Sequence, residues 1–172
     1  MIEGYTVHRN VLPSPMMASL WEFLSSLSFT RTERGIIHLE RALQSDNTNN
    51  GQARYLIELL KANGLDQFIA FDDVSVVHYR DGADYVGWHS DGGPLLNEGC
   101  AMGVLSLGDT RTMEFRRIDG DKAEASEVLN AGDLIVSREG FQFLYQHRIP
   151  PKPDGGERLS IVLFTHNKKK RK

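Results

Sequence analysis

The run Val74-Ser75-Val76-Val77-His78-Tyr79, followed by the dipeptide Asp81-Gly82, decides the fold of this 172-residue chain. Because β-branched and aromatic residues fill the run and Asp-Gly favours turns, the pattern predicts a strand that ends in a tight turn. From Phe71 onward, short apolar runs of this kind alternate with glycine-containing turns. Five further strands are expected at residues 101–107, 112–118, 133–137, 141–148 and 159–165.

The part of the chain before these strands predicts helices. Ser14 and Pro15 are typical of an N-cap and a first helical position. Residues 16–27 then place apolar side chains on one helical face, and residues 52–62 form a second such segment that ends at Asn63-Gly64. Two helices followed by seven or eight strands predict an α+β or mainly β class, a sandwich or jelly roll with N-terminal buttressing helices.

Charge is distributed unevenly along the chain. The chain has 20 basic and 23 acidic residues, and residues 168–172 alone carry +5, so the other 167 residues carry 15 basic and 23 acidic groups, a net charge of −8. An acidic body of this kind predicts no broad phosphate-binding face, although it leaves room for a local basic patch. We expect one domain over residues 1–167 and a basic tail over residues 168–172.

Composition places the chain among soluble globular proteins. No apolar run approaches the ~18 residues that span a bilayer, and the start lacks the basic and apolar regions of a signal peptide. The single cysteine, Cys100, cannot form an internal disulfide. We expect an intracellular monomer without membrane association, cytoplasmic or, in a eukaryote, nuclear.

The segment Trp88-His89-Ser90-Asp91 predicts a metal site. Residues i and i+2 of a strand point to the same side, so His89 and Asp91 can bind one metal from one segment. His147, on a later predicted strand, is the candidate third ligand. Two imidazoles and one carboxylate on one face of an octahedron are typical of non-haem iron(II) oxygenases, in which a 2-oxo acid takes two of the open positions and dioxygen takes the third.

A second group of residues predicts a carboxylate site. Arg158 follows His147 by eleven residues and shares a strand face with Ser160. A guanidinium fork beside a hydroxyl suits a buried carboxylate. Tyr79 lies ten residues before His89, and its phenol is positioned to donate a further hydrogen bond. His78, its neighbour, is expected to face the other way.

Together these residues resemble the AlkB-type dioxygenases. The similarity covers about residues 70–166 and implies a double-stranded β-helix, iron(II), 2-oxoglutarate, dioxygen and oxidative hydroxylation. In this family, hydroxylation of an N-linked methyl group yields an unstable product that loses formaldehyde. The matching motifs are Tyr79-Arg80-Asp81-Gly82 through His89-Ser90-Asp91, then Ser106 to Arg111 with Phe115-Arg116, and then Gly132 to Val136, Gln142, Tyr145, His147, Ile149-Pro150 and Arg158.

The chain also departs from that family. Val77 and Phe164 stand where the family usually has an asparagine and a second arginine, which normally help to hold the metal-side carboxylate of 2-oxoglutarate. The Pro-Arg segment of many nucleic-acid demethylases in the family is absent as well. Residues 30–50 occupy roughly its place, with Arg31, Arg34 and Arg41 available.

The resemblance favours a nucleic acid base as the substrate, either single-stranded or flipped out of a duplex. Trp88, Met113 and Arg116 are expected to line the substrate side of the metal. Phosphate binding is expected from a local cluster of basic residues. The alternative substrate is a protein side chain or a small molecule at the same metal centre, and a third possibility is a barrel without activity. The basic cluster that is expected to bind phosphate comprises Arg31, Arg34, Arg111, Arg116, Arg117 and residues 168–172.

Overall fold

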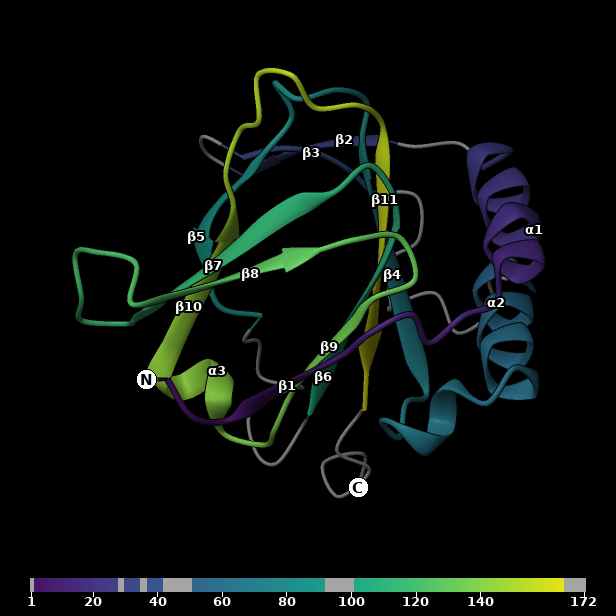
Figure 1. The fold of residues 1–172 in the computed structure, drawn as a ribbon, viewed down its shortest axis with the longest axis horizontal. Helices are drawn as coiled ribbons and strands as arrows, with labels where there is room; N and C mark the ends of the chain where they lie inside the picture. Colours follow the sequence, from purple (N-terminus) through teal and green to yellow (C-terminus); the bar gives the residue numbers. More distant parts are fainter. Residues whose placement is uncertain (1, 28–29, 35–36, 42–50, 92–100, 166–172) are drawn as a thin grey trace.

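Two antiparallel sheets face each other, and two helices cover the outer side of the larger one (Figure 1). The computed structural model describes residues 2–27, 30–34, 37–41, 51–91 and 101–165, without the side chains of 30–34 and 37–41. The larger sheet has the order β1 (Tyr5–His8), β9 (Leu134–Ser137), β6 (Met102–Gly108), β11 (Arg158–Phe164), β4 (Asp73–Tyr79), β3 (Ile37–Arg41) and β2 (Thr30–Arg34). The smaller has the order β5 (Val86–His89), β10 (Tyr145–Ile149), β7 (Arg111–Arg117) and β8 (Ala125–Leu129).

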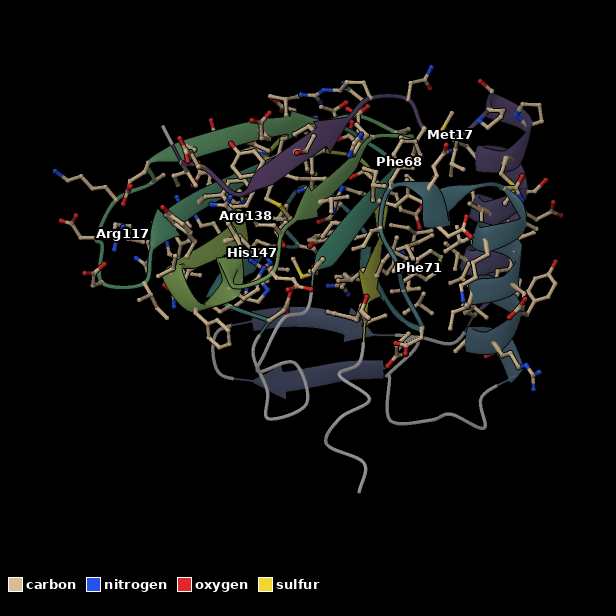
Figure 2. The ribbon with its side chains drawn as sticks, turned by 90° about the horizontal axis from the view of Figure 1, so that it is seen from below. Met17, Phe68, Phe71, Arg117, Arg138 and His147 are labelled. Atoms are coloured by element: carbon tan, nitrogen blue, oxygen red, sulfur yellow. The ribbon has the colours of Figure 1, made fainter. Side chains whose placement is uncertain are left out.

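Alternation along β4 and β11 divides the apolar residues between two cores. One set of side chains packs under the helices α1 (Ser14–Ser25) and α2 (Gly51–Ala62), with Val74 and Ile161 as examples. The other set points between the sheets, where Val77 lies. Both faces of the two strands are therefore buried, which explains their continuous apolar character. Figure 2 shows the helices on one side of the larger sheet and His147 on the other, between the sheets.

The predicted strands and helices are found with small shifts at their ends, except in one place. Residues 141–148 were expected to form one strand. Their first half forms a helical turn, α3 (Phe141–Leu144), and β10 begins only at Tyr145. Gly140, at φ +80°, turns the chain into α3, and the Phe141 ring packs edge-on against Phe115 between the sheets. The tertiary contact outweighs local strand preference here. The N-cap expectation is also wrong, because α1 already starts at Ser14 and has no side-chain cap.

Several parts of the sequence analysis lie outside the described residues. These are Cys100, the side chains of Arg31, Arg34 and Arg41, and the tail at 168–172. Among the helices that the structure does describe, none is long and apolar enough to cross a membrane. The strands β1, β2, β3 and β8 were not predicted.

Asp133 joins the N-terminal segment to the turn before β9. Its buried carboxylate accepts hydrogen bonds from the Arg9 guanidinium at 2.7 Å and from the backbone amides of Asn10 and Asn130 at 3.0 Å each. Burial alone would raise the pKa of this carboxyl, but these donors outweigh burial and hold the pKa below its ordinary value.

We therefore expect Asp133→Asn to lower the free energy of unfolding at neutral pH by about 1–3 kcal/mol. Since the folded pKa is depressed, the stabilisation by the carboxylate is present above the unfolded value near 3.9 and is lost as pH falls through the folded value. Urea unfolding of both proteins from pH 7 to pH 3 checks this. A difference that stays constant over that range would contradict it.

Candidate active site

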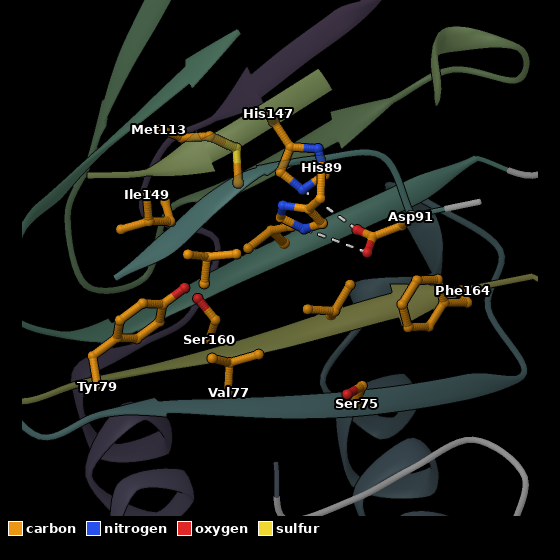
Figure 3. Close-up of a pocket in the computed structure, with 13 residues that line it drawn as sticks. Ser75, Val77, Tyr79, His89, Asp91, Met113, His147, Ile149, Ser160 and Phe164 are labelled. Atoms are coloured by element: carbon orange, nitrogen blue, oxygen red, sulfur yellow. Dashed lines mark ion pairs between the residues drawn. The ribbon is translucent and has the colours of Figure 1, made fainter. Parts of the chain in front are cut away.

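Three predicted metal ligands converge between the sheets. His89 ends β5, Asp91 follows two residues later, and His147 lies on β10 directly opposite His89. His147 Nε2 lies 3.4 Å from one carboxylate oxygen of Asp91, and His89 Nε2 lies 3.6 Å from the other (Figure 3). One donor atom from each residue lies within 4.8 Å of the other two. The expected convergence is therefore found.

Local backbone features orient these side chains. β5 and β10 pair at His89 with His147 and at Val86 with Ile149. Between these two pairs β5 has one residue more than β10, an irregularity of the bulge type that turns both Val86 and His89 toward the interior. His89 Nδ1 lies 2.8 Å from the carbonyl of Gly87. Because a carbonyl only accepts, Nδ1 carries the proton and Nε2 keeps its lone pair facing Asp91.

The segment after β5 is held by the α3–β10 region. The Asp91 amide donates to the side-chain oxygen of Gln142 at 3.1 Å, and the Ser90 hydroxyl donates to the Tyr145 carbonyl at 3.0 Å. The extended direction of the chain therefore continues beyond the last strand residue, which keeps Asp91 on the same side as His89. Gln142 matched a family motif in the sequence, but its contact with Asp91 was not predicted.

The donor set fits a single divalent ion. Ligand atoms about 2.1 Å from one metal and at right angles to each other are about 3.0 Å apart, close to the two separations between histidine and Asp91. Two neutral imidazoles and one carboxylate suit iron(II) better than a closed tetrahedral zinc site, which needs a fourth protein ligand. No fourth histidine, cysteine or acidic residue joins the group within the described part of the chain.

The pocket below the triad has a floor made of alternate residues from β4 and β11. Tyr79 and Ser160 both line it, and Figure 3 shows them toward the same end of the floor. Arg158 pairs with Tyr79 across the two strands, and its guanidinium carbon lies 5.0 Å from the centre of the Tyr79 ring. As expected, Arg158 and Ser160 share the inner face.

Arg158 is an unusual buried cation. Its side chain is 0% exposed and donates from Nη2 to the Ser106 hydroxyl at 2.9 Å, whereas Nε and Nη1 have no partner among the described residues. Burial lowers the pKa of Arg158 and raises that of the Tyr79 phenol, because each charged form is disfavoured away from water. A carboxylate beside Arg158 would satisfy the remaining N–H groups and offset the desolvation.

The expected substrate wall is only partly found. Met113 lines the pocket, but Trp88 and Arg116 do not. Strand alternation turns both to the outer face of the smaller sheet, where the guanidinium carbons of Arg116 and Arg148 each lie 4.6 Å from the centre of the Trp88 ring. His78 likewise points away from the pocket, and its Nε2 lies 2.7 Å from Glu157.

Arg111 does not belong to the expected basic surface cluster, because it is only 1% exposed. It donates to the carbonyls of Asp81, Asp84 and Gly156 and thereby joins the loop that follows β4 to the loop that precedes β11. In the sequence, Arg111 stands at the start of a strand and before a polar residue, and this pattern did not indicate that it joins two loops. Arg117, by contrast, is exposed at the far end of the smaller sheet (Figure 2).

Replacing Arg111 by alanine should lower the free energy of unfolding by about 3 kcal/mol, since three carbonyls lose a charged donor in a buried setting. Arg117→Ala is the matched control, and its effect should stay within about 0.5 kcal/mol. Urea unfolding at pH 7 measures both. Equal effects of the two substitutions would show that Arg111 has no such role.

At the other end of the pocket, Ser75 and Val162 were not anticipated. Ser75, Val162 and Phe164 continue the same alternation and line that end. The period-two pattern from Tyr79 back through Val77 to Ser75 is the signal that would have identified Ser75.

Comparison with known proteins gives both a family and a fold. The family model described as the 2OG-Fe(II) oxygenase superfamily matches residues 37–171. Alpha-ketoglutarate-dependent dioxygenase alkB homolog 3 of Rattus norvegicus is 34% identical over 102 residues, which are 55% of this chain and 35% of that protein. The chain thus matches only about a third of the length of this relative.

Solved structures share the fold at low sequence identity. The structure of OsALKBH1 has a TM-score of 0.68 at 17% identity and covers 96% of this chain and 98% of its own. A prolyl-4-hydroxylase from Pseudomonas putida has a TM-score of 0.60 at 17% identity and covers 95% of this chain and 93% of its own. The predicted jelly-roll class is therefore confirmed.

Proposed function

Because this chain belongs to the 2OG-Fe(II) oxygenase superfamily, we propose that it hydroxylates a nucleic acid base and removes N-linked methyl groups from it by oxidation. The observation that carries the proposal is the triad of His89, Asp91 and His147 above a pocket lined by Tyr79, whose ring lies against the buried Arg158. The resemblance to AlkB-type dioxygenases, which the curated relatives confirm, supplies the substrate class.

We assign the roles of the site residues as follows. His89 Nε2, an oxygen of Asp91 and His147 Nε2 would hold iron(II), and Arg158 would bind the distal carboxylate of 2-oxoglutarate. Bound iron(II) supplies the oxidising chemistry, in which 2-oxoglutarate and dioxygen are consumed as the substrate is hydroxylated. Tyr79 stays protonated, because burial raises its pKa, and therefore donates to the same carboxylate.

The remaining pocket residues exclude water and orient the reactants. Val77, Met113 and Ile149 form apolar walls next to the triad. The Gly87 carbonyl fixes the tautomer of His89, so that its Nε2 is ready to bind the metal without a proton transfer. Asp91 and His89 are partly exposed whereas His147 is buried, so access to the centre is from the β5 side. A substrate would therefore approach the candidate ligands from that side.

The tail offers a test of the substrate class. We consider the case in which each of the five basic residues at 168–172 contacts one phosphate of a single-stranded nucleic acid. These contacts then add about −3.5 to the slope of log affinity against log salt concentration, since each contributes roughly −0.7. Deleting residues 168–172 should weaken oligonucleotide binding and flatten its salt dependence, with 2-oxoglutarate affinity unchanged. Titrations of labelled single-stranded DNA and RNA at several salt concentrations measure this.

A hydroxylase of a protein side chain or a small molecule is the second candidate. The observation that favours it is the apolar character of Val77 and Phe164, at positions where the AlkB-type pattern has polar residues. This candidate predicts no appreciable oligonucleotide affinity at low salt, with or without the tail. Succinate formation in the presence of peptides and metabolites, compared with methylated oligonucleotides, separates the two candidates.

A further inference from the structure

The pocket is longer than 2-oxoglutarate requires. Tyr79 and Ser75 line its opposite ends and are four residues apart on β4, which corresponds to about 14 Å of strand. The carboxyl carbons of 2-oxoglutarate are joined by four C–C bonds and lie about 5 Å apart when extended, at about 1.5 Å per bond. An acid held by Arg158 at the Tyr79 end therefore leaves the Ser75 end open to another molecule.

The Ser75 end has one polar group among apolar walls. Ser75 is 6% exposed, and its hydroxyl oxygen has no hydrogen-bond partner among the described residues. It pairs with Val162 across β4 and β11, and Phe164 lies two residues further along β11. Figure 3 shows Phe164 and Ser75 at this end of the floor, with Asp91 above Phe164. The candidate metal ligand Asp91 lines the same pocket, whereas Val162, opposite Ser75, is four residues from Arg158 along β11.

We propose that Ser75 and Phe164 form the subsite for the substrate base, an inference that rests on the proposed function. A half-buried phenyl ring offers a face for stacking, and every nucleobase has a face to match it. A buried hydroxyl without a partner is costly, and a ring nitrogen or exocyclic group of a base satisfies it as either donor or acceptor. Apart from the candidate metal ligand Asp91, the residues that line this end are uncharged, so the subsite suits a flat, neutral ring.

Phe164 also gives this position a different function from the arginine of the AlkB-type pattern. An arginine there would add a charge next to the metal-side carboxylate of 2-oxoglutarate. A phenyl ring adds no charge and contributes apolar surface instead. Substitutions at Phe164 and Ser75 should therefore affect the substrate and leave the affinity for 2-oxoglutarate unchanged.

The test measures substrate and cosubstrate separately. Phe164→Leu keeps an apolar side chain but removes the aromatic face, and Ser75→Ala removes only the hydroxyl. KM for a single-stranded oligonucleotide with one N-methylated base, measured by formaldehyde release, should rise about tenfold for Phe164→Leu and about fivefold for Ser75→Ala. Val128→Ala, on the exposed part of β8, is the matched control and should match the wild type.

Binding of 2-oxoglutarate in the presence of Mn(II), without oxygen, shows whether each variant keeps an intact pocket. Its Kd should match that of the wild type in both variants. A higher KM with unchanged Kd supports the subsite. A weaker Kd for 2-oxoglutarate in either variant, or an unchanged KM in both, overturns it. If the wild type releases no formaldehyde from the oligonucleotide, the proposed function is overturned as well. The assay of the wild type therefore distinguishes this failure from a failure of the subsite alone.

Discussion

Asp91→Ala is expected to abolish hydroxylation and leave the protein folded. The carboxylate lies between the two imidazoles at 3.4 and 3.6 Å, so it is the residue on which both histidines depend for a shared ion. Two imidazoles alone hold a divalent ion weakly, and removing one of three ligands should reduce turnover at least 1,000-fold, about 4 kcal/mol. The assay is 2-oxoglutarate-dependent succinate formation at saturating iron(II).

The matched control for this substitution is Asp119→Ala, which removes a carboxylate that is exposed on the β7–β8 turn. It should keep full activity. Circular dichroism and urea unfolding of Asp91→Ala should resemble the wild type, because Asp91 lies outside the strands and near solvent. Residual activity within tenfold of the wild type would remove Asp91 from the metal site.

Arg158→Ala is expected to raise the 2-oxoglutarate requirement by at least about 30-fold, corresponding to the ~2 kcal/mol or more lost when one partner of a buried charged pair is removed. The fork of Arg158 fits a carboxylate in two-point contact, so Arg158→Lys should recover only part of the affinity. KM for 2-oxoglutarate and its Kd in the presence of Mn(II) measure the effect.

Stability measurements separate this binding role from a structural one. Without an anion the buried guanidinium is costly, so Arg158→Ala should not lower the free energy of unfolding. With 2-oxoglutarate at 100 times its wild-type Kd, the wild type should gain about 2.7 kcal/mol, and the variant should gain at most a small part of that. An unchanged Kd in Arg158→Ala would show that the carboxylate binds elsewhere.

Strand periodicity made much of the site predictable from the sequence. Alternation placed Arg158 and Ser160 on one face and turned His78 away from Tyr79, as the structure shows. The same alternation places Trp88 on the face opposite to His89, away from the pocket that it was expected to line. Short-range spacing of this kind is informative because the strand geometry is nearly independent of the rest of the chain.

Features that depend on tertiary contacts could not be predicted in the same way. The helical turn α3 exists because Phe141 packs between the sheets, and a run of aromatic residues alone favours a strand. Arg111 was expected on the surface, but in the fold the loops of Asp81 and Gly156 contact its guanidinium and bury it. Arg116 was expected to line the pocket, but the register of β7 places it on the outer face of the smaller sheet.

One iron(II) and one 2-oxoglutarate are proposed to share the pocket between the sheets. An anaerobic crystal structure with Mn(II) and 2-oxoglutarate should show one anomalous peak about 2.0–2.2 Å from His89 Nε2, a carboxylate oxygen of Asp91 and His147 Nε2. The distal carboxylate of 2-oxoglutarate should lie within hydrogen-bonding distance of Arg158. A metal bound elsewhere, or a carboxylate remote from Arg158, would rule out this arrangement.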